Sequence, residues 1–211
     1  MFNFLFQFFL ILQLFPSLPF PQEEKEFKSA VWIPYDFKGT EYFKYEVIGK
    51  EEKETKKGFE IIKISKEDDK YKVYIEGKFG KSEGSSTVTV ESKGDIPGVI
   101  LSQAAFNPYI APLAVALFTP AWTYYFTIAG FKFEEGSKWK QKDESGKVIE
   151  MEVVKGTQTY AGKKGKKLII KEDGKEIWVI VWSKDVALPL YIRMGQEKEN
   201  FYELKLVEYK E

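Results

Sequence analysis

Apolar and polar residues alternate along most of the chain after Thr40. In the run Tyr71–Glu76, every second side chain falls on the same side, which is the period of a half-buried strand. The same alternation recurs in Glu41–Ile48, Phe59–Ser65, Thr87–Glu91, Lys147–Val154, Lys166–Lys171, Glu176–Trp182, Leu190–Met194 and Phe201–Glu208. The pattern predicts about nine to eleven strands, each with one packed face and one wet face.

Short clusters of turn-forming residues separate these runs. They include Lys66–Lys70, Asp143–Gly146 and Glu172–Lys175, and the Asp-Gly pair in the last of these is typical of a type I′ hairpin. No segment has the caps and the 3.6-residue period of a helix that connects parallel strands. The sequence therefore predicts an antiparallel all-β fold.

One segment interrupts the pattern. Residues 96–131 contain no charged residue, although 30% of the whole chain is charged. Four prolines divide the segment, so we expect short helices, at Gly98–Phe106 and Pro112–Phe118, rather than one helix that spans a membrane.

Three interpretations of residues 96–131 remain open. As core, their short helices would pack on the concave face of a bent sheet. As a lid over an apolar cavity, they would bring these side chains to a ligand: Phe106, Leu113, Leu117, Phe118, Trp122 and Tyr125. As an exposed patch, they would dock on a membrane or on a partner protein. The first two are compatible, because a half-open sheet closed by a helix often leaves a lined pocket.

The amino-terminal residues form a second uncharged segment. Residues 1–22 carry no charge, and Phe2–Phe15 is almost entirely Phe, Leu and Ile. As a helix this run would be about 21 Å long, shorter than the roughly 30 Å of bilayer hydrocarbon, and three prolines follow it. We expect residues 1–22 to be a signal peptide or an amino-terminal anchor, and residues 23–211 to be a single β-rich domain.

Composition excludes several kinds of chemistry. The chain has no His and no Cys, which removes the usual zinc sites, the Ser-His-Asp and Cys-His catalytic arrangements, and disulfides. Lys plus Arg equals Asp plus Glu, 32 against 32, so we expect no nucleic-acid partner. We also expect no catalytic site, no metal and no cofactor. Arg193 is the one arginine among these residues, and this lysine bias is typical of thermophile proteins.

Three short motifs resemble a known family. They are Gly136-Ser-Lys-Trp139, Thr159–Gly162, and the strand and turn of Trp182–Pro189. With the strands from Thr40 to Glu208, they resemble the LolA-like exported bacterial β-proteins, which are related to the periplasmic lipoprotein carrier. The resemblance implies an antiparallel half-barrel whose open side is covered by apolar helices, and a cavity that holds acyl chains.

Taken together, the sequence predicts an exported, non-enzymatic binding protein that holds a lipid or another hydrophobic ligand in a half-barrel cavity. We expect it in the periplasm or outside the cell. The alternative is a structural or interaction protein of the cell envelope, whose apolar insert docks on a membrane or a partner subunit.

Overall fold

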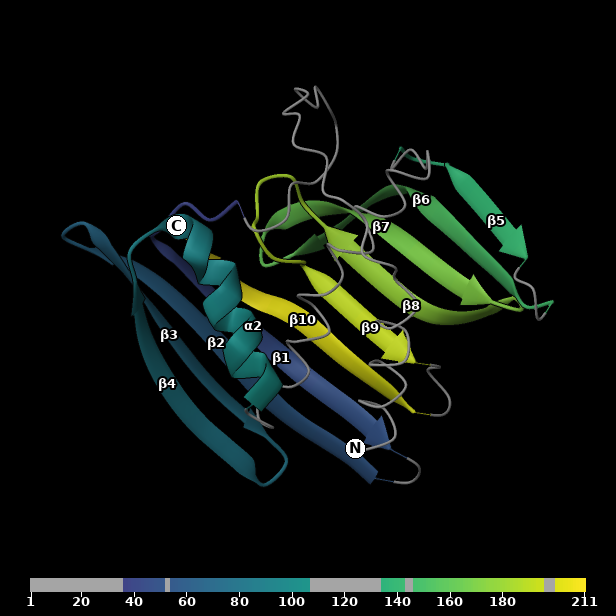
Figure 1. Ribbon diagram of the computed structural model, residues 1–211. Helices are drawn as coiled ribbons and strands as arrows, with labels where there is room; N and C mark the ends of the chain where they lie inside the picture. Colours follow the sequence, from purple (N-terminus) through teal and green to yellow (C-terminus); the bar gives the residue numbers. More distant parts are fainter. Residues whose placement is uncertain (1–35, 52–53, 107–133, 143–145, 196–199) are drawn as a thin grey trace.

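The computed structural model describes residues 36–51, 54–106, 134–142, 146–195 and 200–211 (Figure 1). Their strands are β1 (Glu41–Glu51), β2 (Glu54–Glu67), β3 (Lys70–Phe79), β4 (Ser82–Val90), β5 (Lys138–Lys142), β6 (Val148–Tyr160), β7 (Lys163–Glu172), β8 (Lys175–Trp182), β9 (Tyr191–Gly195) and β10 (Phe201–Lys210). A 3₁₀ turn, η1 (Lys93–Asp95), and one α-helix, α2 (Ile96–Phe106), follow β4.

All ten strands belong to one sheet, in the order β4-β3-β2-β1-β10-β9-β8-β7-β6-β5, and every neighbouring pair is antiparallel. The strands β1 to β4 form one meander and β5 to β10 form another. Pairing of β1 with β10 joins the two in the middle of the sheet. The predicted all-β fold, a curved antiparallel sheet with a short helical insert, is confirmed.

The local predictions can be compared with these elements one by one. Each predicted run overlaps a strand, and the expected helix Gly98–Phe106 lies within α2. Asp173 and Gly174 both have positive φ, 48° and 78°, as a type I′ turn requires. The alternation missed β5, because Trp139 is the only apolar residue of that strand, although the Gly136–Trp139 motif overlaps its start. The second expected helix, Pro112–Phe118, lies outside the described residues.

The face of the sheet on which α2 packs, here called the inner face, is mostly apolar across both meanders, and the buried carboxylates of Glu41 and Glu60 lie on its β1 and β2 part. One row of side chains crosses it from β6 to β1 through directly paired residues, and each member is at most 3% exposed: Val153, Leu168, Ile180, Ile192, Leu204 and Val47. Alternate residues of β10, such as Lys205 and Val207, point away from this row. They are exposed on the opposite face of the sheet, here called the outer face. The alternation seen in the sequence therefore separates a buried face from a wet one.

The junction of β1 and β10 contains a buried carboxylate. Glu41 is only 3% exposed, and it accepts hydrogen bonds from the Lys38 N–H (2.7 Å), the Gly39 N–H (3.4 Å) and the Tyr209 hydroxyl (3.4 Å). Burial raises the pKa of Glu41 above its ordinary value, although these hydrogen bonds and the Lys38 charge act in the other direction. The rings of Phe43 and Tyr209 pack beside it, with centroids 5.2 Å apart.

This raised pKa predicts a pH effect on stability. The folded protein binds the Glu41 proton more tightly than the unfolded chain, so the Glu41 contribution becomes more favourable as pH falls through the folded pKa. We expect wild type to gain free energy of unfolding relative to Glu41→Gln between pH 7 and about pH 4.5, in urea titrations. Parallel pH profiles of the two proteins would show that Glu41 titrates normally.

Close contact between β2 and β3 gives a second prediction. A Cβ at Gly58 would overlap the carbonyl oxygen of Lys78 on β3, whereas a Cβ at Gly98 in α2 would meet no atom within 4 Å. Gly58→Ala should lower the free energy of unfolding by about 1–3 kcal/mol, because the two strands would have to separate. Gly98→Ala should raise it by roughly 0.5–1 kcal/mol, because alanine loses less backbone entropy in a helix. Thermal denaturation of both variants tests the contrast, which equal melting temperatures would contradict.

Candidate functional site

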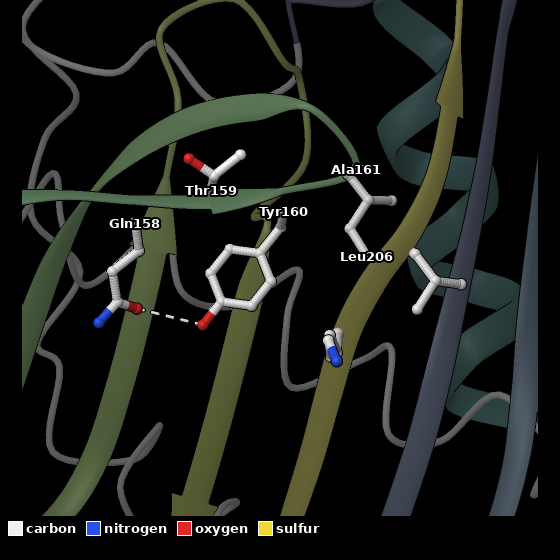
Figure 2. A pocket seen from close by; sticks show the side chains of 7 residues that line it. Gln158, Thr159, Tyr160, Ala161 and Leu206 are labelled. Atoms are coloured by element: carbon white, nitrogen blue, oxygen red, sulfur yellow. Dashed lines mark hydrogen bonds between the residues drawn. The ribbon is translucent and has the colours of Figure 1, made fainter.

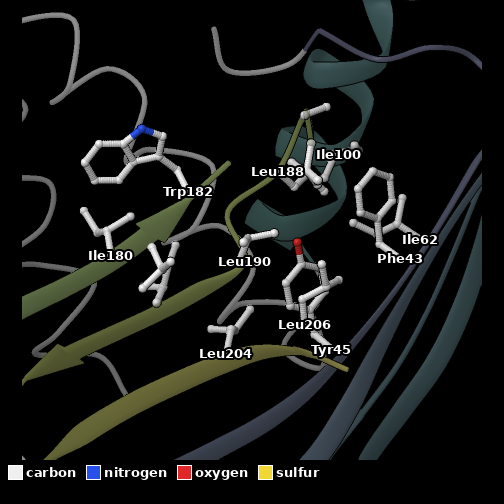
Figure 3. Packing of buried hydrophobic residues seen from close by; sticks show 14 of the residues in the cluster. Phe43, Tyr45, Ile62, Ile100, Ile180, Trp182, Leu188, Leu190, Leu204 and Leu206 are labelled. Carbon is white, nitrogen blue, oxygen red and sulfur yellow. The ribbon is translucent and has the colours of Figure 1, made fainter. Parts of the chain in front are cut away.

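The part of the inner face that α2 covers is closed by a second segment. Residues 183–190 connect β8 to β9, and Val186, Leu188 and Leu190 of this connection are at most 2% exposed. Figure 3 shows Leu188 next to Ile100 of α2, with Phe43 and Ile62 of the sheet nearby. This region is a packed hydrophobic core rather than a binding surface.

A buried tyrosine fixes this connection to the sheet. The hydroxyl of Tyr45, on β1, donates a 2.8 Å hydrogen bond to the carbonyl oxygen of Pro189. Burial raises the pKa of Tyr45 well above its ordinary value, and the negative charge of Glu60, its partner on β2, adds to the effect. Tyr45 therefore stays protonated and remains a donor.

The second part of the inner face lies on β6 to β9, and we call it the apolar patch. Its side chains, all at most 9% exposed, form two adjacent rows: Met151, Ile170, Trp178 and Met194, and Val153, Leu168, Ile180 and Ile192. Among the described elements, α2 packs on β3 and β4. These strands lie at the opposite end of the strand order from β6 to β9, and α2 covers the same face of the sheet. Figure 1 likewise shows the helix in front of β1 to β4 and away from β6 to β8.

The chemistry of the apolar patch suits a hydrophobic ligand. It contains no charged side chain, and its two methionines have flexible, polarisable side chains that adapt to irregular shapes. Such a surface can exclude water and hold an alkyl chain, but it offers no acid, base or nucleophile. Within the described residues, no group of three or more acidic residues is placed to hold a metal ion.

The six ligand-contact residues predicted from the sequence are not tested by this arrangement. Phe106 is the last residue of α2, and its side chain is outside the described part of the structure. The other five lie outside the described residues: Leu113, Leu117, Phe118, Trp122 and Tyr125. In the described ranges, no helix is long and apolar enough to cross a membrane.

A hollow on the outer face was not anticipated from the sequence. It has a volume of about 650 Å³ and lies between the tip of the β6–β7 hairpin, Gln158–Ala161, and Lys205–Val207 of β10 (Figure 2). The hydroxyl of Tyr160 donates to Gln158 (3.1 Å), and the Tyr160 ring stacks on Tyr191 at 5.4 Å. The hollow is open and half polar, so it is a weaker candidate for a hydrophobic ligand than the inner face. A bulge between Val154 and Thr157 bends this hairpin, which no sequence pattern indicates.

Ion pairs cover the outer face. Lys140 pairs with Glu150 across β5 and β6 at 2.6 Å, and the half-buried Arg193 pairs with Glu176 across β9 and β8 at 2.7 Å. Lys38 and Lys163 together lower the pKa of Glu211 to about 2. Exposed pairs of this kind contribute little stability each, and they keep the outer face solvated.

Comparison with known proteins gives distant structural matches. No protein-family model and no curated protein matches the chain. The MucA/MucB complex of Pseudomonas aeruginosa matches with a TM-score of 0.40 and 12% identity, over 82% of this chain and 52% of that chain. A β-barrel-like DUF1849 protein of Brucella abortus matches with a TM-score of 0.32 and 8% identity, over 81% and 96% of the two chains.

The matches also include a putative outer membrane lipoprotein-sorting protein domain of Vibrio parahaemolyticus. Its TM-score is 0.24 at 10% identity, over 83% of this chain and 87% of that one. The structural matches thus include a lipoprotein-sorting domain, the kind of protein that the three motifs resemble. The chain spans about half of the length of the MucB chains. At this level of similarity, the matches carry no argument about function.

The Tyr45–Pro189 hydrogen bond gives a third prediction. Tyr45→Phe leaves the buried Pro189 carbonyl without its donor, and should lower the free energy of unfolding by about 1–3 kcal/mol. Tyr74→Phe is the matched control, because the Tyr74 hydroxyl bonds Glu76 on the outer face, and we expect a change within about 0.5 kcal/mol. Chemical denaturation measures both. Equal losses of the free energy of unfolding would show that the Tyr45–Pro189 hydrogen bond stabilises the protein no more than the Tyr74–Glu76 bond does.

Proposed function

We propose that this protein is an exported, non-enzymatic binding protein that holds an acyl chain or a similar hydrophobic ligand against its inner face. The observation that carries the proposal is the apolar patch on β6 to β9, with two cross-strand rows of buried apolar side chains and no charged group. Because no chemically reactive group accompanies it, binding rather than catalysis is the activity that this surface supports best.

The dimensions of the patch suit an alkyl chain. Its rows cross four strands, and at about 4.8 Å between neighbouring strands each row is roughly 14 Å long. Each methylene removed from water contributes about 0.8 kcal/mol, so ten methylenes would contribute about 8 kcal/mol before the cost of ordering the ligand. This gain is of the same order as the roughly 4–15 kcal/mol that association costs, so contacts with a covering segment would be needed for tight retention of a lipid.

In this proposal, the part of the uncharged segment 96–131 that follows α2 covers the ligand, because α2 itself packs on β3 and β4. The whole segment connects β4 to β5, which are the two ends of the described sheet, so this part of the chain links opposite edges of the inner face. The lid residues would be those expected from the sequence: Phe106, Leu113, Leu117, Phe118, Trp122 and Tyr125. Residues 1–22 would act as the export signal or anchor, which places the protein in the periplasm or outside the cell.

Mass spectrometry tests for a bound ligand. We expect protein that is expressed from the full chain and purified without detergent to carry a lipid in native spectra and to lose it on denaturation. Because a ligand that binds only the folded state stabilises it, delipidated protein should melt at a lower temperature than protein as purified. A lipid-free protein with an unchanged melting temperature would contradict the proposal, and would favour an envelope protein whose insert docks on a membrane or partner.

Photo-crosslinking tests where the ligand binds. A fatty acid with a photoreactive diazirine on its chain should label the apolar patch, at Met151 or Met194, and residues of the 96–131 segment. The outer hollow at Lys205–Val207 serves as an internal control, and we expect no label there. Labelling confined to that hollow would place the ligand on the outer face and overturn the assignment.

A further inference from the structure

The two edges of the sheet differ in how they are protected against pairing. The edge strand β5 has five residues, and lysines occupy its alternate positions 138, 140 and 142. The opposite edge strand, β4, has nine residues, and Glu83 is its only charged residue. Short length and lysines are common devices that keep an edge from pairing with another chain. By these criteria β5 is protected and β4 is not.

The strand β4 is also regular enough to accept another strand. It pairs with β3 from Ser82 to Val90 without a register shift, so no bulge bends it away from a neighbour. Among the described strands, none pairs with its other side, and Figure 1 shows it at the border of the sheet. Alternate residues of an antiparallel strand direct both N–H and C=O to the same side, so β4 presents a row of unpaired backbone groups there.

We propose that β4 pairs with β4 of a second copy of this chain, antiparallel, about a two-fold axis at Ser86. In this register, Ser82 lies opposite Val90 of the second copy, and all nine residues of β4 have a partner. Opposite residues have the same parity in the strand, so inner-face side chains meet inner-face side chains. The two sheets then become one continuous sheet, whose inner faces lie on the same side.

The charges near β4 select this register. Glu83 lies opposite Thr89 of the second copy, and just beyond the strand ends Lys81 lies opposite Glu91 of the second copy. A shift by one side-chain repeat in one direction would put Glu83 opposite Glu91, which is a repulsive pair. The same shift in the other direction would leave Thr89 and Val90 without a partner in the strand and would lose the contact between Lys81 and Glu91.

The side chain on the proposed axis supports the choice of a second copy over another partner. Among the described residues, the hydroxyl of Ser86 is buried and has no hydrogen-bond partner. Directly opposite residues in antiparallel strands have Cβ atoms about 4.5–5.5 Å apart, where serine and threonine hydroxyls can bond each other. On the axis, Ser86 meets its own copy, and the pairs of Ser85 with Thr87 on either side also bring hydroxyls together.

The other edge strand, β5, is unsuited to pairing with its own copy. Antiparallel self-pairing of that strand would place Lys140 opposite Lys140 of the second copy and Lys138 opposite Lys142. Like charges that are directly opposite each other destabilise a strand pair. Association through β4 therefore stops at a closed two-fold dimer and does not continue into a fibre.

Disulfide trapping tests the register. The chain has no cysteine, so a single introduced cysteine reports on one position. Under mild oxidation, full-length Ser86→Cys should form a covalent dimer, because the two copies meet on the axis within disulfide reach. Ser82→Cys is the matched control: this residue lies opposite Val90, about 27 Å from its own copy at 3.4 Å per residue. Equal dimer yields at both positions, or none at Ser86→Cys, would overturn the register.

Charge substitutions test the interface without a crosslink. Ser85 and Thr87 are exposed on the outer face, so Ser85→Lys/Thr87→Lys should leave the fold intact while it places lysine opposite lysine twice. Sedimentation should show a dimer dissociation constant at least roughly tenfold weaker than that of wild type. Ser85→Lys/Thr87→Glu, which pairs lysine with glutamate, should restore the dimer. A monomeric wild type, or a dimer insensitive to both variants, would overturn the proposal, whatever the result for ligand binding.

Discussion

The rest of the structure depends on the pairing of β1 with β10. These strands are the first and last described along the chain, yet they are neighbours in the middle of the sheet. Their pairing joins two meanders that would each have a free edge there. It also decides the outer edges: with β1 and β10 in the centre, β4 and β5 must be the two ends. The inner face is continuous across this seam, where Val47 of β1 lies opposite Leu204 of β10.

The pairing of β1 with β10 also separates two parts of the inner face, one on β1 to β4 and one on β6 to β9. On the β1–β4 side, α2 and the connection 183–190 cover the sheet, and the Tyr45 hydrogen bond to Pro189 holds the connection in place. On the β6–β9 side, the two buried rows carry no charged side chain, and the Trp178 indole N–H is their one side-chain hydrogen-bond donor. Ion pairs such as Lys140–Glu150 lie on the outer face. Both regions are buried and belong to one hydrophobic cluster, and they differ in that α2 packs on the β3–β4 part.

The sequence predicted the strands because their period follows from burial of one face. Tyr71–Glu76 alternates, since the odd positions of β3 face the core, and the Asp173-Gly174 turn follows from the positive φ that this pair tolerates. Strand order was not predictable in the same way. The register of Val47 with Leu204 depends on contacts between distant residues, and no local pattern encodes them. The strand β5 has too few apolar residues to show a period.

The candidate site was only partly predictable for the same reason. Trp178 was recognised as part of a strand, but its row with Met151 and Met194 exists only once four strands are paired. The outer hollow depends on the bulge after Val154, where the chain inserts residues into the β6–β7 pairing. Bulges change direction through backbone geometry, which a hydrophobic pattern does not record.

The position of β10 has a consequence for how the protein is made. Glu41 and Tyr209, which meet at the seam, are 168 positions apart in the chain. During synthesis, β1 to β4 emerge long before β10, so this edge of β1 has no partner until β10 has been made. Contacts of such long sequence separation form slowly, and unpaired edges aggregate. Until β10 has been made, β1 is therefore an open edge that can pair with another chain.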